Sequence, residues 1–295
     1  MLSETVEVYR SGRQADASER AFVLTAVGIP SELHREEVHY VLRVDALHET
    51  EARAHLLRYQ DERLAGRKPW TAAAVRLHGA AWVGCLFYGL VLIGVAYAVA
   101  SGAFRLDSFD RGDLSAAEVR QGQWWRAWTA LTLHLDAAHL AANLAAGVWF
   151  GYLAGRLLGP GVAWVLIVNG AAAANLLEGS LAPAGHRSAG ASTAVFTALG
   201  LLAAYSWRER HRLPQSWPRR WSPLIAGVVL LGWLGTAGEH TDVFAHLAGF
   251  VAGVLLGTLA AVAAVRTVLE RTPQWLAGAL ALGAVAAAWA CGLRA

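Results

Sequence analysis

Charged side chains are scarce in this 295-residue sequence, where they make up 16% of the residues. A soluble domain of this size needs more charge to cover its surface, so the scarcity argues against a wholly soluble protein. Hydrophobic residues reach 56% and the mean hydropathy is +0.37, as expected of a chain with membrane-spanning segments. The net charge of +3 is small and no basic stripe with interleaved aromatic residues occurs, so we expect no nucleic-acid partner.

Cysteine is almost absent as well, since only Cys85 and Cys291 occur and both lie in apolar segments. Single buried thiols usually act as small apolar side chains, so neither a disulfide nor a cysteine metal site is predicted. The first residues, Met1–Arg10, are polar and lack the apolar stretch of a cleavable signal peptide. We therefore expect the first spanning helix to direct membrane insertion.

Much of the charge lies in residues 1–76, which predicts a small soluble α+β domain ahead of a membrane region. Thr5–Tyr9 and His39–Val44 alternate as strands do, and Ala46–Glu62 has helical spacing of its apolar residues. The sequence assigns this domain no function beyond that of a soluble packing or regulatory module.

Apolar segments dominate the chain from about Gly79 onward. A helix needs about 20 residues to cross the hydrocarbon core, and backbone groups in lipid must be paired within helices. The sequence therefore predicts an all-α polytopic membrane region with seven segments, at 79–101, 136–156, 161–178, 190–207, 223–237, 242–265 and 274–292. The fifth is short for a span.

Orientation follows from the Lys and Arg residues in the connections, because these residues favour the cytoplasmic side. Twelve of them fall on the side of the N-terminal domain and six on the other side. We expect that domain to be cytoplasmic, in a cell (inner) membrane, so that the second, fourth and sixth segments run from outside to inside.

Four polar residues stand at the outer ends of those three segments: His139 and Asn143 in the second, Ser192 in the fourth and His246 in the sixth. Polar groups inside spanning helices are costly and usually functional. All four lie in first helical turns, so we expect them at one depth, just below the outer surface.

Ser192 and His246 have the chemistry of a nucleophile and its base. A serine at a helix N-terminus lies beside free backbone N–H groups that can stabilise an oxyanion, and histidine can take the hydroxyl proton. Small residues recur every four positions after Ala245, at Gly249, Gly253 and Gly257, which favours close packing against the fourth segment. We expect Phe196, one turn below the serine, to pack on the imidazole.

His139 and Asn143 are four residues apart and therefore share one helix face, from which both can donate hydrogen bonds to an oxyanion. A zinc site built from His134, His139 and His246 is the main rival, but no His-Glu-x-x-His segment or cysteine pair supports it. An aspartyl protease needs two acidic residues within helices, whereas Glu178 and Asp242 lie at helix ends and Glu239 lies in a loop. We expect Asp242 to cap the sixth helix.

Four blocks across residues 124–257 together resemble the rhomboid family of intramembrane serine proteases. They are Trp125-Arg126 with Thr129, His139 with Asn143, Gly190-Ala191-Ser192, and Ala245-His246 followed by Gly249 and Gly253. Gly190 belongs to the nucleophile motif. The sequence departs from the family pattern at Thr193, where glycine is common, at Gly155, where glutamate is common, and at Phe196, where tyrosine is common.

The resemblance implies a six-helix catalytic core over 77–270, an additional helix over 271–295 and a Ser192–His246 dyad without an acidic member, cofactor or metal. His139 and Asn143 would bind the oxyanion, with Gly190 and Phe196 in support. The substrates would be transmembrane proteins in the lipid bilayer, admitted past the fifth segment and the connection after it. The alternative is a non-catalytic relative that binds membrane clients; the sequence leaves the oligomeric state open.

Overall fold

The structure, a computed structural model, describes residues 5–66, 77–103, 109–211, 216–235 and 242–294. The chain divides into two compact units, Met1–Ala74 and Val75–Ala295. The expected domain boundary at residue 76, the loop position of Glu239 and the connection 236–241 after the fifth segment lie outside the described residues.

The N-terminal unit is a three-stranded antiparallel sheet of order β1-β3-β2 with two helices. Its elements are β1 (Thr5–Ser11), α1 (Gln14–Ala26), β2 (Ser31–Glu36), β3 (His39–Asp45), η1 (Ala46–His48) and α2 (Glu49–Gly66). The apolar core joins Leu24 of α1 to Leu42 and Val44 of β3 and to Ala52 of α2. The predicted strands and helix are confirmed, whereas α1 and β2 were not predicted: the larger apolar residues of α1 form one run, Phe22–Leu24, and β2 has a single apolar residue, Leu33.

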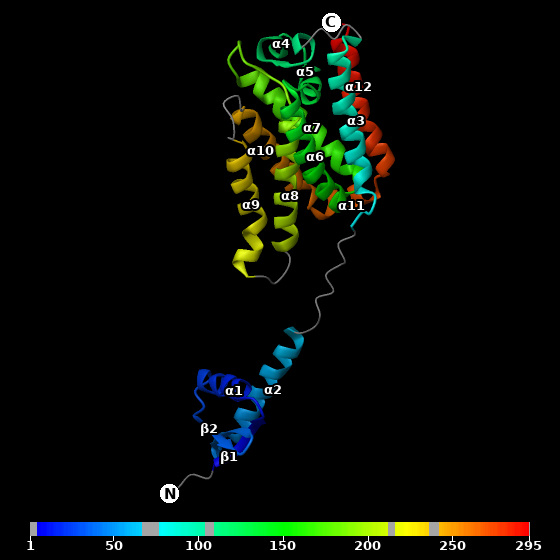
Figure 1. The fold of residues 1–295 in the computed structure, drawn as a ribbon. Helices are drawn as coiled ribbons and strands as arrows, with labels where there is room; N and C mark the ends of the chain where they lie inside the picture. The colour runs from blue at the N-terminus through cyan, green and yellow to red at the C-terminus, as the bar shows by residue number, and fades with distance from the viewer. Residues whose placement is uncertain (1–4, 67–76, 104–108, 212–215, 236–241, 295) are drawn as a thin grey trace. The chain divides into compact units, whose positions relative to one another are not determined.

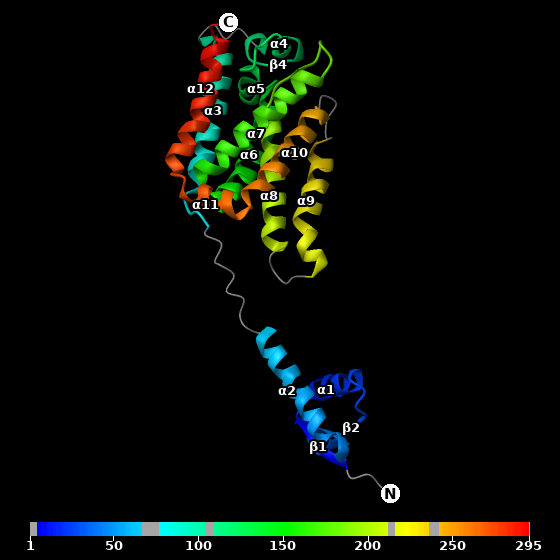
Figure 2. The ribbon, with the colours of Figure 1, turned by 180° about the vertical axis from the view of Figure 1, so that it is seen from behind.

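The second unit is helical (Figures 1 and 2). Its long helices are α3 (Ala81–Ala100), α6 (Ala137–Leu158), α7 (Pro160–Leu181), α8 (Ser192–His211), α9 (Trp217–Gly235), α10 (Val243–Ala260) and α12 (Gln274–Gly292). Its short elements are η3 (Phe109–Arg111), β4 (Leu114–Ser115), α4 (Ala116–Arg120), α5 (Arg126–Thr129), η4 (Ala130–Thr132), β5 (Arg187–Ser188) and α11 (Ala263–Arg271). Within this unit α4 and α5 lie at one end of the bundle and α11 at the other (Figure 1).

Each of the seven predicted segments overlaps one long helix, and α6, α7 and α8 run two, three and four residues past their approximate predicted ends. Four of them, α3, α7, α10 and α12, are long and apolar enough to cross a membrane. Two predicted boundaries were wrong. The fifth helix begins at Trp217 instead of 223, because Pro218 in the first turn needs no N–H partner there and Pro223 is accommodated inside the helix. The sixth ends at Ala260, and α11 follows after a turn that the apolar sequence does not signal.

Helices α8 and α10 pack closely along the predicted stripe of glycines. A Cβ atom added to Gly253 would lie 2.1 Å from the Thr197 carbonyl oxygen, and one on Gly257 would lie 2.4 Å from that of Leu201. In the other direction, a Cβ on Gly200 would lie 2.1 Å from the Phe250 carbonyl oxygen. Because these distances are too short for any side chain, glycine is what lets the two backbones touch.

Candidate active site

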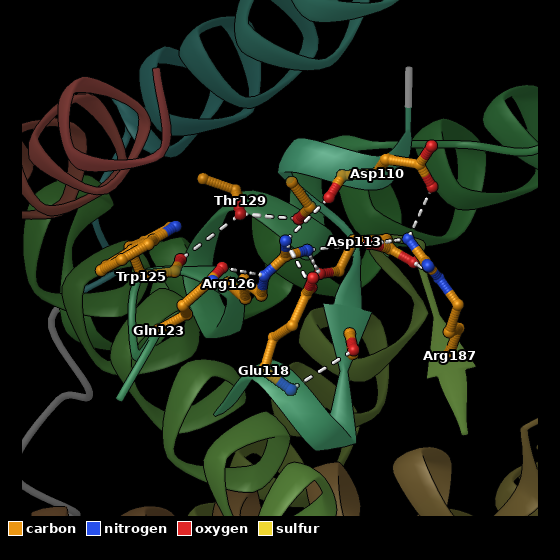
Figure 3. A network of polar contacts seen from close by, with 10 residues as sticks. Asp110, Asp113, Glu118, Gln123, Trp125, Arg126, Thr129 and Arg187 are labelled. Atoms are coloured by element: carbon orange, nitrogen blue, oxygen red, sulfur yellow. Dashed lines mark hydrogen bonds and ion pairs between the residues drawn. The ribbon is translucent and has the colours of Figure 1, made fainter. Parts of the chain in front are cut away.

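A buried ion-pair network holds the connection between α3 and α6 against the strand that precedes α8 (Figure 3). Arg126 is 3% exposed and donates from Nη1 to the Asp113 backbone oxygen and to Oδ1, each at 2.9 Å. Asp113 also accepts from Arg187 Nε at 2.6 Å, and Arg126 pairs with Glu118. The Thr129 hydroxyl donates to the Gly112 carbonyl at 2.6 Å. The Trp125-Arg126…Thr129 block is thus a brace, away from the predicted reacting groups.

The segment before α8 is fixed at three points. β5 pairs with β4, the N–H of Gly190 donates to the Ala130 carbonyl at 2.9 Å, and the N–H of Ala191 donates to His134 Nε2 at 3.3 Å. Gly190 has φ +146°, which favours glycine, and a Cβ there would lie 2.8 Å from the His139 ring. These contacts set where α8 begins, and its first residue is Ser192.

One cavity of about 1280 Å³ collects five of the six predicted site residues, and Gly190 is not among the residues that line it. It is lined by side chains from α6, α8 and α10, among them His139, Asn143, Ser192, Phe196 and His246. Asn143, Phe196 and His246 are each less than a tenth exposed. The prediction that these helices bring their polar residues to one level agrees with this arrangement.

His246 is held from two sides. Its Nδ1 lies 3.0 Å from the carbonyl oxygen of Gly235, the last residue of α9, and a carbonyl can only accept, so Nδ1 carries the proton when the ring is neutral. Phe196 packs on the ring with centroids 4.4 Å apart, which confirms that predicted contact. Nε2 is therefore left as the acceptor. Within the described residues Ser192 and His246 share the cavity without a hydrogen bond between them.

The α6 residues lie across the cavity. Asn143 donates from Nδ2 to the His139 carbonyl oxygen at 3.0 Å, and because an amide carries two N–H bonds one remains for another acceptor. The His139 ring lies beside Gly190 and makes an edge contact with His134, with centroids 5.2 Å apart. His134 had no assigned role in the sequence; the structure makes it the acceptor that orients the residue before Ser192.

Thr193 does not crowd the cavity. It is 4% exposed, and its carbonyl oxygen and Cγ2 face Gly249 of α10, where an added Cβ would meet them at 2.6 and 3.1 Å. Its hydroxyl-bearing side chain is absent from the cavity lining, so this departure from the family pattern is a packing feature of the α8–α10 contact.

Asp242 caps α10, as predicted, by accepting from the Ala245 N–H at 2.9 Å. His186, which no motif singled out, lies 3.0 Å from Asp242 and 2.6 Å from Glu178. His186 and Asp242 line the cavity, Glu178 lies next to them, and none of the three belongs to the predicted dyad.

A family model matches the part of the chain that forms most of the cavity. The Rhomboid domain model matches residues 121–262, which include His139, Asn143, Ser192, Phe196 and His246. The chain belongs to the rhomboid family. Together with its apolar helices, this makes it a multi-pass membrane protein, in which α3 and α6–α10 supply six long helices and α12 is additional.

Three curated rhomboid relatives are similar to this chain. Rhomboid protease GluP of Bacillus subtilis (strain 168) is 29% identical over 135 residues, which are 46% of this chain and 26% of GluP. Two Toxoplasma gondii proteins also match: Rhomboid-like protease 3 is 31% identical over 63% of this chain and 62% of its own length, and Rhomboid-like protease 2 is 28% identical over 47% and 48%. The matched segments thus span less than two thirds of each relative.

Proposed function

We propose that this rhomboid is an intramembrane serine endopeptidase that cuts peptide bonds in or near transmembrane segments of other membrane proteins. One observation carries the proposal: Ser192 begins α8 on the same cavity as His246, whose Nδ1 is engaged by the Gly235 carbonyl. That hydrogen bond supports a role for Nε2 as the base without any acidic third residue. The names of the three relatives as proteases are consistent with it.

In the proposed reaction His246 Nε2 removes the Ser192 proton as Oγ attacks the substrate carbonyl carbon. The oxyanion accepts hydrogen bonds from the free N–H of Asn143 and from His139. As the carbon–nitrogen bond breaks, the imidazolium returns the proton to the leaving amine, which leaves an acyl-enzyme. Water, deprotonated by His246, then hydrolyses the ester and restores the Ser192 hydroxyl.

We further propose residues 77–270 as the catalytic core, 271–295 as an addition and 1–76 as a cytoplasmic domain, with the cavity opening to the outer side of a cell membrane. The bias of Lys and Arg toward the N-terminal side supports this orientation. In this arrangement water reaches Ser192 from outside. A substrate helix must unwind near that surface before its backbone can reach Oγ.

The test is cleavage of a transmembrane reporter by purified protein in liposomes. The wild type should cut, and Ser192→Ala and His246→Ala should each lower the rate by at least about 10²-fold, the scale of general-base catalysis. Ser101→Ala is the matched control and should cut normally, because Ser101 follows α3 and its exposed hydroxyl donates to the Ala98 carbonyl. Equal cutting by wild type and Ser192→Ala refutes the dyad. A folded wild type that cuts none of several reporters but binds them favours the client-binding alternative.

A further inference from the structure

Three metal-ligating side chains meet at the rim of the cavity, and we call them the rim cluster: Glu178 in the last turn of α7, His186 in the connection before β5, and Asp242 at the start of α10. One ligand atom from each lies within 4.8 Å of the others. His186 Nε2 is 2.6 Å from Glu178 Oε1 and 3.0 Å from Asp242 Oδ2. The cluster therefore joins two helix ends and a loop.

The charges of the rim cluster do not balance without another positive species. Glu178 is fully buried, and one of its carboxyl oxygens lies within 4.8 Å of one of Asp242. In the part of the chain that the structure describes, Glu178 Oε2 and Asp242 Oδ2 are buried without a hydrogen bond of good geometry, and Oδ2 has only the His186 contact at 3.0 Å. Two facing carboxylates need a shared proton or a cation between them, because a buried unpaired charge is costly.

We propose that the rim cluster binds one divalent transition-metal cation of the zinc type, through Glu178, His186 Nε2 and Asp242. Two carboxylate oxygens and one imidazole nitrogen are a ligand set that Zn²⁺ accepts. Bonds of roughly 2.0–2.2 Å in a tetrahedral site separate neighbouring ligand atoms by about 3.3 Å, so small side-chain shifts adapt the cluster.

The fourth position of the cation would face water. His186 and Asp242 both line the cavity, while Glu178 closes the site from inside the bundle. The cation would take the place of the shared proton and connect the end of α7 to the first turn of α10. This site contains neither Ser192 nor His246, so the proposal stands whether or not the chain is a peptidase.

The test is calorimetric titration of metal-free, untagged full-length protein in detergent with Zn²⁺ alone. Wild type should bind one equivalent, and binding should raise its midpoint of thermal unfolding. His186→Gln and Glu178→Gln should each weaken the affinity at least about 10-fold. His34→Gln is the matched control, because His34 also contacts a carboxylate, Glu32, at 3.0 Å but in the N-terminal unit; it should bind as wild type does.

Three outcomes overturn the proposal. The first is that folded wild type takes up no Zn²⁺, which would leave a shared proton between Glu178 and Asp242. The second is that His186→Gln binds as tightly as wild type. The third is that His139→Ala abolishes binding while His186→Gln keeps it, which would place the cation at the His134–His139 pair. Since His186 is partly exposed, its replacement tests the site even if Glu178→Gln fails to fold.

Discussion

Replacing Gly253 by alanine should push apart the two helices that carry Ser192 and His246. The added Cβ would lie 2.1 Å from the Thr197 carbonyl oxygen and 2.8 Å from the Leu201 nitrogen, both of them backbone atoms of α8 that cannot rotate away. Ordinary van der Waals contact begins near 3.4 Å. The helices must therefore separate by about 1 Å at this level, and the displacement is transmitted toward the cavity two turns away.

The magnitude follows from two opposed effects. Overpacking a tight contact costs about 1–3 kcal/mol, while alanine gains up to about 1 kcal/mol over glycine in a helix interior. We expect a net destabilisation of about 1–2 kcal/mol, which corresponds to a fall of about 2–8 °C in the midpoint of thermal unfolding. The rate of reporter cleavage should also fall, by up to about 10²-fold, because a displacement of about 1 Å between the proposed nucleophile Ser192 and its proposed base His246 can cost that much.

The assay compares thermal unfolding and reporter cleavage for Gly253→Ala and a control, Gly94→Ala in α3. A Cβ on Gly94 has no neighbour within 4 Å, so this variant should keep wild-type activity and lose no stability. If Gly253→Ala matches Gly94→Ala in both measurements, then close backbone contact between α8 and α10 does not set the geometry of the site.

Further substitutions test the parts that surround the dyad. Phe196→Leu removes the ring that packs on His246 and should lower the rate of reporter cleavage by folded protein about 2–10-fold. An unchanged rate would show that the Phe196 ring does not orient His246. Asp113→Asn removes one of the two carboxylates paired with the buried Arg126, leaving Glu118, and should cost about 1.5–3 kcal/mol in chemical unfolding, against about 1 kcal/mol or less for the half-exposed Arg187→Gln; equal losses would contradict the brace. Burial, then the neighbouring His139, lower the pKa of His134 to about 4, so its neutral form stabilises the fold fully above about pH 6.5 and that stability is lost as the pH falls toward 4. The unfolding midpoint of His134→Gln should depend less on pH across that window than the wild type's, and an identical pH profile would refute this.

Much of the candidate site was predictable, because the helical repeat and the alternating direction of successive helices restrict where polar residues can lie. Ser192, His246, His139 and Asn143 stand near the N-terminal ends of alternate segments, and the four-residue glycine stripe predicted which helices touch. The contact of Phe196 with His246 was predicted because Phe196 lies four residues, about one helical turn, after Ser192. The structure agrees with each of these positions.

Other contacts had no signal in the sequence, because they join residues far apart in irregular segments. The pairing of Asp113 with Arg187 spans 74 positions between two short strands. His134 could not be assigned because its five-residue offset from His139 points the two side chains apart along a helix, whereas His134 lies in an extended segment before α6. His186 lies in a loop, and its contact with Glu178 and Asp242 depends on how α7 and α10 end.

The central claim is that Ser192 is a nucleophile activated by His246, and covalent labelling tests it without knowledge of the substrate. Purified wild type, Ser192→Ala, His246→Ala and Ser101→Ala would be treated with a fluorophosphonate probe, and the modified residue would be identified by mass spectrometry. The account predicts one adduct at Ser192 in the wild type and in Ser101→Ala, and none in the other two. Labelling of Ser192 that persists at the wild-type rate in His246→Ala, or no labelling of folded wild type, would contradict it.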